Sequence, residues 1–330
     1  MTVVSMKRKQ EIISSLEGTG KRPLFQYWEE YKSDYIRAKR SKDTIENTRQ
    51  TLSRILIYSE LISIEDWLVP GKAQDEFFRL TEERKWSEST HNSYRKNLSS
   101  YFRHLVKRGH IQNNPIKDGI VRMPELVQDQ PVASNEQIHT ILNLLENTKF
   151  GINLLQRLRD RLFFTLMAGT GARPKELLNL RLGSFSGNRD EVTIQTAKSS
   201  GKKRVYPLNQ KTIDLVRAYI REVVIYGRDM ELNKSFFLGR EKGEAWGYDG
   251  IRKFFTKVTK ETGAPITAYM LRRHAATELY DKGVDIHKIQ HLMGHSSATT
   301  TSRYIQAKAS MNKETADILF SITDSVGVSQ

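Results

Sequence analysis

The 330-residue chain contains no cysteine, which excludes disulfides, thiolate nucleophiles and Cys-ligated zinc and suits a reducing cytoplasm. Acidic residues are fewer than basic ones, since the chain has 38 Asp and Glu but 53 Lys and Arg, which gives a net charge of +15. No apolar run approaches the roughly 18 residues that a membrane-spanning helix requires. The first residues also lack an apolar segment with a small-residue cleavage site. We therefore expect a cytoplasmic protein that is neither secreted nor membrane-bound.

The positive charge extends over the whole chain. Residues 1–130 contain 23 basic and 18 acidic residues, which leaves 53 − 23 = 30 basic and 38 − 18 = 20 acidic residues in 131–330. Both parts are therefore positive, by 5 and by 10 charges. A charge excess of one sign in both parts favours a polyanionic partner that contacts both, and nucleic acid is such a partner.

Apolar residues recur at helical spacing from Pro23 to His110, without the alternation typical of strands. The pattern predicts four helices, near 24–35, 43–58, 73–83 and 87–109. We expect them to form a compact domain over 23–112, preceded by a polar lead-in at 1–22 that is mobile or weakly helical. Residues 113–133 contain three prolines and no clear period, which predicts a linker before a second domain at 134–330.

The fourth predicted helix carries basic residues mixed with tyrosine and phenylalanine. Basic groups in such a setting can follow a DNA backbone, where phosphate contacts contribute affinity but little sequence information. A solvated helix face would show the same pattern. The candidates for DNA contact are Arg95, Lys96, Arg103 and Lys107.

The second domain begins with a predicted helix capped by Ser134 or Asn135, and a second helix over 153–168 ends at a glycine pair. Arg173 follows two residues after the second glycine, and Pro174 suits the first turn of another helix. Two strand-like runs, 191–196 and 203–208, are joined by a basic turn that contains Lys198 and Lys202. Lys203 opens the second run. Helices are expected near 210–225 and 248–262.

The C-terminal part contains two amphipathic runs with chemically useful residues at their ends. The first begins Tyr269-Met-Leu-Arg272 and is closed by a glycine, and the second ends in Gly294-His295. Tyr304 follows His295 by nine residues. A tyrosine that shares a pocket with arginines and a histidine is suited to attack on a phosphodiester. A zinc site is the rival interpretation, because histidines recur every four residues, at 287, 291 and 295.

These motifs occur in a defined order, namely G-T-G-A-R-P-K-E-L at 169–177, a basic hairpin around Lys198, Y-M-L-R at 269–272, L-M-G-H at 292–295, and Tyr304. In order and spacing the chain resembles the tyrosine recombinase, or phage integrase, family, over about residues 23–323. The resemblance implies a mainly α fold with a small β-sheet. It also implies a helical core-binding (SAM-like) domain followed by a mixed α/β catalytic domain.

The resemblance also implies roles for individual residues. Arg173 and Arg272 would clamp the scissile phosphate, because guanidinium groups bind phosphate oxygens in a fork. His295 would accept or share the proton of the Tyr304 nucleophile, and Lys198 would protonate the 5′-oxygen that leaves. Lys202 and Lys203 lie close enough in sequence to be alternatives to Lys198. Most of the family has a histidine where this chain has Tyr269, which can donate a hydrogen bond but is a poor proton acceptor near neutral pH.

The resulting hypothesis is a site-specific recombinase that exchanges DNA strands through a 3′-phosphotyrosine without metal or nucleotide. Its partners would be double-stranded DNA with specific recombination sites and three further copies of itself in a homotetramer. Residues 311–323 are the candidate helix for docking on a neighbouring protomer. Two alternatives are a nicking-closing enzyme of the type IB topoisomerase kind and a DNA-binding regulator on the same fold.

Overall fold

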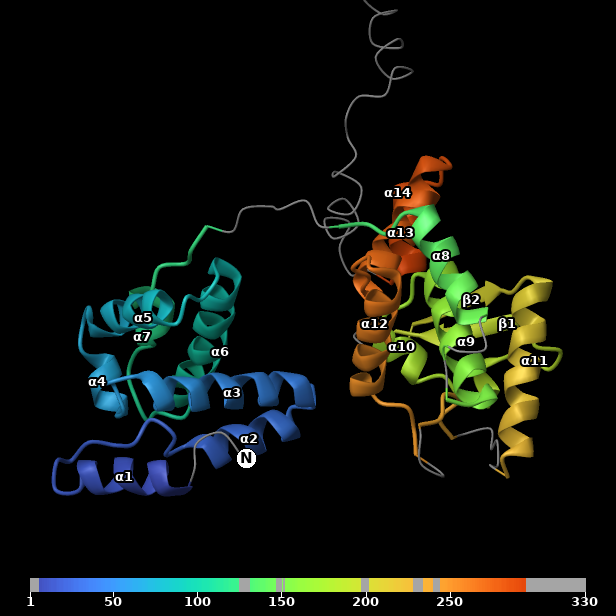
Figure 1. Ribbon diagram of the computed structural model, residues 1–330. Coiled ribbons are helices and arrows are strands. Elements are labelled where there is room, and N and C mark those ends of the chain that lie inside the picture. Colours follow the sequence, from blue (N-terminus) through green and yellow to red (C-terminus); the bar gives the residue numbers. More distant parts are fainter. Residues whose placement is uncertain are drawn as a thin grey trace, which may run out of the picture. The chain divides into compact units, whose positions relative to one another are not determined.

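The computed structural model describes residues 6–124, 131–146, 150, 152–196, 202–227, 234–239 and 244–294. They belong to two compact units, Met1–Val127 and Gln128–Gln330 (Figure 1). Helices dominate both, and the named strands of the described chain form one two-stranded antiparallel sheet. The expected fold class, mainly α with a small β-sheet, is therefore confirmed. None of the described helices combines the length and apolar character needed to cross a bilayer.

The helices of the N-terminal unit are α1 (Met6–Leu16), α2 (Trp28–Arg37), α3 (Lys42–Tyr58), α4 (Ile64–Leu68), α5 (Lys72–Glu83), α6 (Glu88–Lys107) and α7 (Pro115–Gly119). Three of them begin at serines, Ser41, Ser63 and Ser87, whose hydroxyls accept the backbone N–H three residues on. Such caps satisfy donors that the first turn of a helix leaves unpaired. The four helices expected from periodicity correspond to α2, α3, α5 and α6.

The N-terminal core extends beyond those four helices at both ends. Ile12 and Leu16 of α1, four residues apart, are buried in the same cluster as the large aromatic residues of α2, α5 and α6. Ile116 and Ile120, in and beside α7, are buried there too. Residues 6–16 thus form a packed helix, whereas the sequence predicted a lead-in that is mobile or weakly helical. Residues 115–120 lie inside the N-terminal unit although the sequence suggested that they begin a linker.

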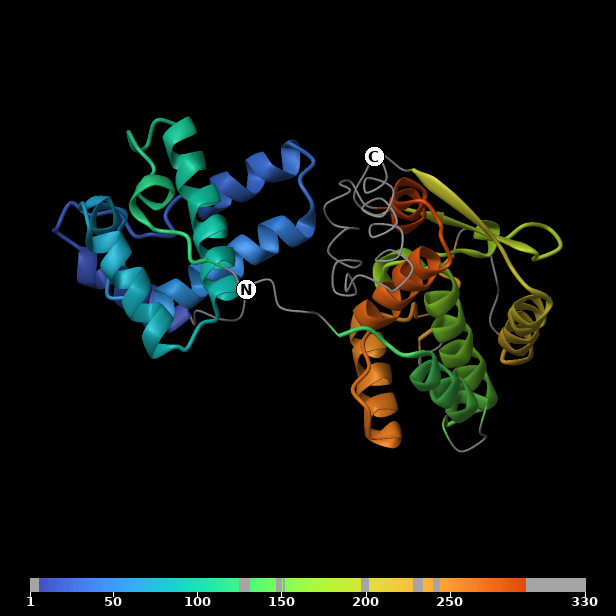
Figure 2. The same ribbon diagram turned by 90° about the horizontal axis from the view of Figure 1, so that it is seen from above.

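The C-terminal unit contains α8 (Asn135–Glu146), α9 (Leu154–Thr170), α10 (Pro174–Leu178), a 3-10 turn (Leu182–Ser184), strands β1 (Glu191–Gln195) and β2 (Lys203–Pro207), α11 (Gln210–Ile225), α12 (Tyr248–Thr262), α13 (Ala268–Asp281) and α14 (Ile286–Met293). Helix α9 lies at the centre, with α8, α11 and α13 packed around it (Figure 2). The two strands pair with Thr193 opposite Val205. Both expected strands and the helices near 210–225 and 248–262 are confirmed.

The end of α9 is held close to α14 by a glycine. Gly171 caps α9 in the left-handed conformation, with φ of 59°. A Cβ at this position would lie 2.8 Å from the terminal methyl of Met293 and 3.0 Å from the Ala275 methyl. Only glycine combines this backbone conformation with so close an approach. The Gly-Thr-Gly motif therefore places Arg173, two residues later, beside the C-terminal end of α14.

Candidate active site

Arg173 lies at the start of α10, as the sequence predicts. It is the N-cap residue, and Pro174 occupies the first helical position. The Glu176 carboxylate accepts the backbone N–H of Arg173 at 3.0 Å and also its Nη1 at 3.0 Å. The first contact is the return half of a capping box, which uses the third helical residue to satisfy the cap's own N–H. Glu176 therefore fixes both the main chain and the side chain of Arg173.

Arg272 lies on α13 and is among the largest fully buried side chains of the protein, with 1% of its surface exposed. A buried guanidinium requires partners, since an unpaired buried charge costs several kcal/mol. Its Nη1 donates to the carbonyl of Gly171 at 2.6 Å, and its Nη2 donates to the carbonyl of Met293. These contacts tie α13 to the ends of both α9 and α14.

The C-terminal end of α14 collects guanidinium groups from three separate elements. The carbonyl of Leu292 accepts from Arg204, that of Met293 from Arg272, and that of Gly294 from Arg173 at 3.1 Å. The last carbonyls of a helix have no intrahelical partner and carry partial negative charge, so cations stabilise them. The two predicted clamp arginines, far apart in sequence, thus lie on consecutive carbonyls.

Glu176 is the buried anion of this cluster, and its side chain is fully enclosed. Burial alone would raise the pKa of Glu176, but the N–H of Arg173 and the guanidinium of Arg204 outweigh it, so the pKa is lowered. The carboxylate is therefore ionised at neutral pH. The spacing R-x-x-E within the motif thus has a physical basis, because the arginine and the glutamate satisfy each other's hydrogen-bonding groups.

Arg204 and Tyr206 are site residues that sequence reasoning missed. Both lie on β2, two residues apart, and both contact the Leu292 carbonyl at 2.5 Å. Side chains two residues apart point to the same face of a strand, and Arg204 is buried between the exposed Lys203 and Val205. The sequence did contain a signal for Arg204, namely a charged residue at a position of a predicted strand whose side chain points into the protein.

Three of the predicted catalytic residues, Lys198, His295 and Tyr304, lie outside the described residues, as does the candidate docking helix at 311–323. Their roles stay predictions. Two neighbours can be placed. Lys202 and Lys203 are exposed where β2 begins, and the Lys202 carbonyl accepts both the N–H and the hydroxyl of Thr196 at 3.0 Å.

Tyr269 lies on the first turn of α13, and half of its surface (49%) is exposed. It makes no hydrogen bond among the described residues, and its ring lines an apolar groove of about 430 Å³ that also includes Pro174. Tyr269 and the residue that follows Arg173 thus line the same groove. His274, also on α13, contacts the Ala133 carbonyl through Nδ1 at 2.8 Å, which gives it a structural role.

On α6, Lys96, Arg103 and Lys107 are exposed, seven and four residues apart. At 3.6 residues per turn this spacing puts them on one face of the helix, and we call these three residues the basic stripe. Arg95 differs, because its Nε and Nη2 donate to the carbonyls of Ile120 at 2.5 Å and Lys117 at 2.8 Å. Those bonds satisfy carbonyls around the end of α7, so Arg95 has a structural role.

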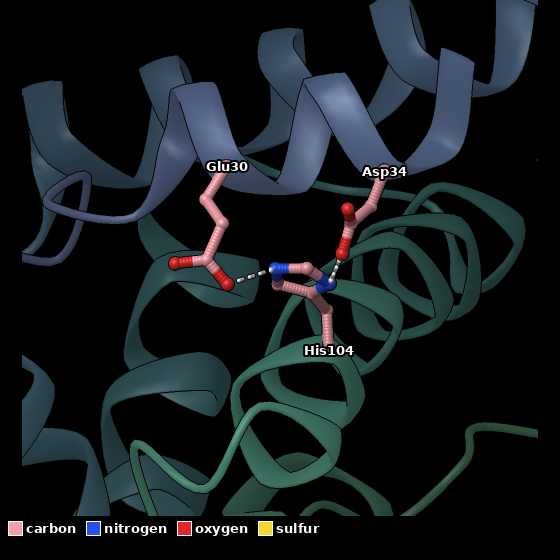
Figure 3. A group of neighbouring side chains, drawn as sticks. All are labelled: Glu30, Asp34 and His104. Atoms are coloured by element: carbon pink, nitrogen blue, oxygen red, sulfur yellow. Dashed lines mark ion pairs between the residues drawn. The ribbon is translucent and has the colours of Figure 1, made fainter. Parts of the chain in front are cut away.

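One cluster in the described residues has the composition of a metal site, namely Glu30 and Asp34 of α2 with His104 of α6 (Figure 3). The imidazole lies between the carboxylates, with Nε2 3.3 Å from Glu30 and Nδ1 3.8 Å from Asp34. A single ion cannot bind both nitrogens of one ring. Arg108 also pairs with both acids, and its charge opposes a cation. We interpret the two acids as ion-pair partners of Arg108, which joins α2 to the end of α6. The rival zinc site at 287, 291 and 295 falls partly outside the described residues.

Comparison with known proteins gives a consistent result. The model of the phage integrase family matches residues 132–311. Among curated proteins, tyrosine recombinase XerD of Listeria innocua is 27% identical over 64% of this chain and 69% of its own length. Tyrosine recombinase XerA of Pyrococcus furiosus is 27% identical over 60% of this chain and 65% of its own.

Two solved structures share the fold. One is the Tn1549 transposon integrase in complex with transposon right end DNA, with a TM-score of 0.66, 18% identity, and coverage of 92% of this chain and 99% of that one. The other is a lambda integrase dimer bound to a COC′ core site, with a TM-score of 0.64, 18% identity, and coverage of 91% and 82%.

Proposed function

The chain belongs to the phage integrase family, the tyrosine recombinases, and from this premise we propose that it is a site-specific DNA recombinase with Tyr304 as its nucleophile. The observation that carries the proposal is the convergence of Arg173 and Arg272 on the consecutive carbonyls of Gly294 and Met293. His295 follows Gly294 directly in the chain. The two guanidinium groups therefore lie beside the residue that precedes His295 in the chain, which supports a site for a scissile phosphate.

In the proposed reaction the Tyr304 hydroxyl attacks the phosphorus, and its proton passes to His295. A Tyr304–phosphate bond forms while the bond to the 5′-oxygen breaks, and Lys198 gives that oxygen its proton. The phosphodiester is exchanged for a phosphotyrosine of similar energy, so no nucleotide is consumed. Attack by the 5′-hydroxyl of a partner strand reverses these steps and completes the exchange.

Arg173 and Arg272 would stabilise the extra negative charge that develops on the phosphate oxygens in the transition state. Preorganised donors of this kind each contribute about 100- to 1,000-fold to a rate. One terminal nitrogen of each arginine donates to a carbonyl at the end of α14, that of Gly294 for Arg173 and that of Met293 for Arg272. Tyr269, which lines the same groove as Pro174, would orient a phosphate oxygen by donating a hydrogen bond.

The N-terminal unit would hold the duplex through the basic stripe of α6. We further propose that the protein acts on double-stranded DNA with specific sites as a homotetramer in the cytoplasm, with residues 311–323 docked on a neighbouring protomer. Support comes from the family membership and from the positive charge of both parts of the chain.

The test is covalent trapping. A pool of nicked duplexes with a randomised central segment is incubated with the protein in EDTA, because the nick lets the cleaved fragment diffuse away and the adduct accumulate. We expect an adduct that survives denaturation, with the phosphate on Tyr304 by peptide mass spectrometry. Tyr304→Phe should abolish it, whereas Tyr280→Phe, a control for an exposed tyrosine of the same unit, should not.

The trapped duplexes, once sequenced, supply the substrate for a strand-exchange assay between two labelled duplexes. Recombinant product is expected from the wild type. An adduct without exchange would favour a nicking-closing enzyme, and binding without any adduct would favour a DNA-binding regulator. An adduct that persists in Tyr304→Phe would refute the assignment of the nucleophile.

A further inference from the structure

Strand β2 carries a buried guanidinium at the centre of the site. Arg204 is 4% exposed, and its two terminal nitrogens have different partners. Nη2 donates to Glu176 at 2.6 Å, and Nη1 donates to the Leu292 carbonyl at 2.5 Å. Its Nε is buried without a hydrogen-bond partner among the described residues. A charge so deeply enclosed is costly unless its contacts serve the fold or the site.

The contact with Glu176 affects the charge of Arg173. Glu176 accepts the main chain and the side chain of Arg173 and, on Oε2, the guanidinium of Arg204. With Arg173 as its only partner, the carboxylate would offset that arginine's positive charge. The second guanidinium leaves the three groups with a net charge of 1 + 1 − 1 = +1, which is available to an approaching phosphate.

The contact with Leu292 fixes the other side of the site. Tyr206 donates to the same carbonyl from the same face of β2, so two donors hold the end of α14 against the strand. The next two carbonyls accept from Arg272 and Arg173. Gly294 also lies close to Arg204, since a Cβ built on Gly294 would be 3.1 Å from the guanidinium carbon of Arg204. Arg204 thus contacts both the group that orients Arg173 and the segment that leads to His295.

We propose that Arg204 is a positioning residue for DNA strand cleavage, which fixes Glu176 and the end of α14 and offsets the charge of Glu176 so that Arg173 stays positive toward the scissile phosphate. This inference rests on the proposed recombinase function. It requires that loss of Arg204 slow the chemical step much more than it weakens DNA binding. DNA affinity depends on many phosphate contacts, whereas a small displacement of catalytic groups can cost about 100-fold in rate.

The experiment measures single-turnover adduct formation on a duplex trapped by the wild-type protein, together with the Kd for that duplex. The main variant is Arg204→Met, which keeps length and apolar packing but removes charge and donors. Arg204→Lys restores the charge, and the double variant Arg204→Met/Glu176→Gln removes the carboxylate that would be left underpaired. The matched control is Arg159→Met, because Arg159 is also buried, pairs with the buried Asp160 and donates to a carbonyl, yet shares none of these contacts.

We expect Arg204→Met to cleave about 10- to 100-fold more slowly, with Kd within about threefold of the wild type. Arg204→Lys and the double variant should each recover part of the rate, and Arg159→Met should cleave at the wild-type rate. A wild-type rate for Arg204→Met, or an equal loss in Arg159→Met, would overturn the inference. Failure of both Arg204→Lys and the double variant to recover any of the rate would refute the role of charge. If the wild type itself forms no adduct, it is the proposed function that fails.

Discussion

Gly294 offers a direct test of how tightly the site is packed, because a second glycine provides a matched control. Gly294 and Gly283 each follow a helix and each adopt the left-handed conformation, with φ of 62° and 75°. A Cβ at Gly294 would lie 2.8 Å from the Thr196 side chain and 3.1 Å from Arg204, whereas nothing lies within 4 Å of one at Gly283. Replacing each glycine by alanine therefore separates the cost of the left-handed backbone, which both variants share, from the cost of a steric clash, which only Gly294→Ala has.

The left-handed conformation costs an L-residue about 1–2 kcal/mol, and both variants bear this cost. Only Gly294→Ala adds overpacking, which costs about 1–3 kcal/mol in a well-packed interior. Thr196 cannot yield easily, since it is buried and bound to the Lys202 carbonyl. We expect Gly294→Ala to be less stable than Gly283→Ala by about 2 kcal/mol, which corresponds to about 4–8 °C in melting temperature for a unit of this size.

Differential scanning calorimetry of the full chain measures both variants, and the transition of the C-terminal unit is the one compared. Single-turnover adduct formation adds a second readout, because the collision displaces the hairpin end and Arg204 while the change at Gly283 touches neither. Gly294→Ala should therefore also cleave more slowly. Equal melting temperatures in the two variants would refute the close packing of α14 on β2.

Three further predictions concern other parts of the protein. Replacing the three residues of the basic stripe by glutamines should reduce the slope of log K for DNA binding against log salt concentration by about 2–3 in anisotropy titrations. Arg95→Gln should instead lower the melting temperature and leave that slope unchanged. An unchanged slope in the triple variant would contradict a DNA contact. Burial lowers the pKa of His91 and of His104 below the ordinary 6.5, so folding favours their neutral forms, and the N-terminal unit should be stable above that value and lose stability as pH falls through the lowered pKa values. Melting curves between pH 7.5 and 5.5 measure this, and His91→Gln should flatten the decline. Tyr269→Phe should slow cleavage about 10- to 100-fold, as expected for loss of a hydrogen bond to a charged group. The control is Tyr248→Phe, which changes another ring of the same groove and should cleave at the wild-type rate. Equal cleavage rates in Tyr269→Phe and Tyr248→Phe would refute the orienting role.

Local signals in the sequence determined most of the secondary structure. Helical periodicity located α3, α5 and α6, and the basic turn between two strand-like runs located the hairpin. Pro174 identified the helix start that carries Arg173. These features depend on residues within a few positions of one another, so their chemistry can be read directly from the chain.

Only the tertiary structure decided which charged residues of those elements pair and which residues are buried. Arg204, Glu176 and Leu292 meet although they are far apart in sequence, and no local pattern encodes which buried carboxylate a buried guanidinium will find. The same holds for Ile12 of α1 and Ile116 of α7, which join the N-terminal core from segments whose composition suggested a lead-in and a linker. Burial depends on surfaces that form only when distant elements pack, whereas helix caps and turns depend on neighbours along the chain.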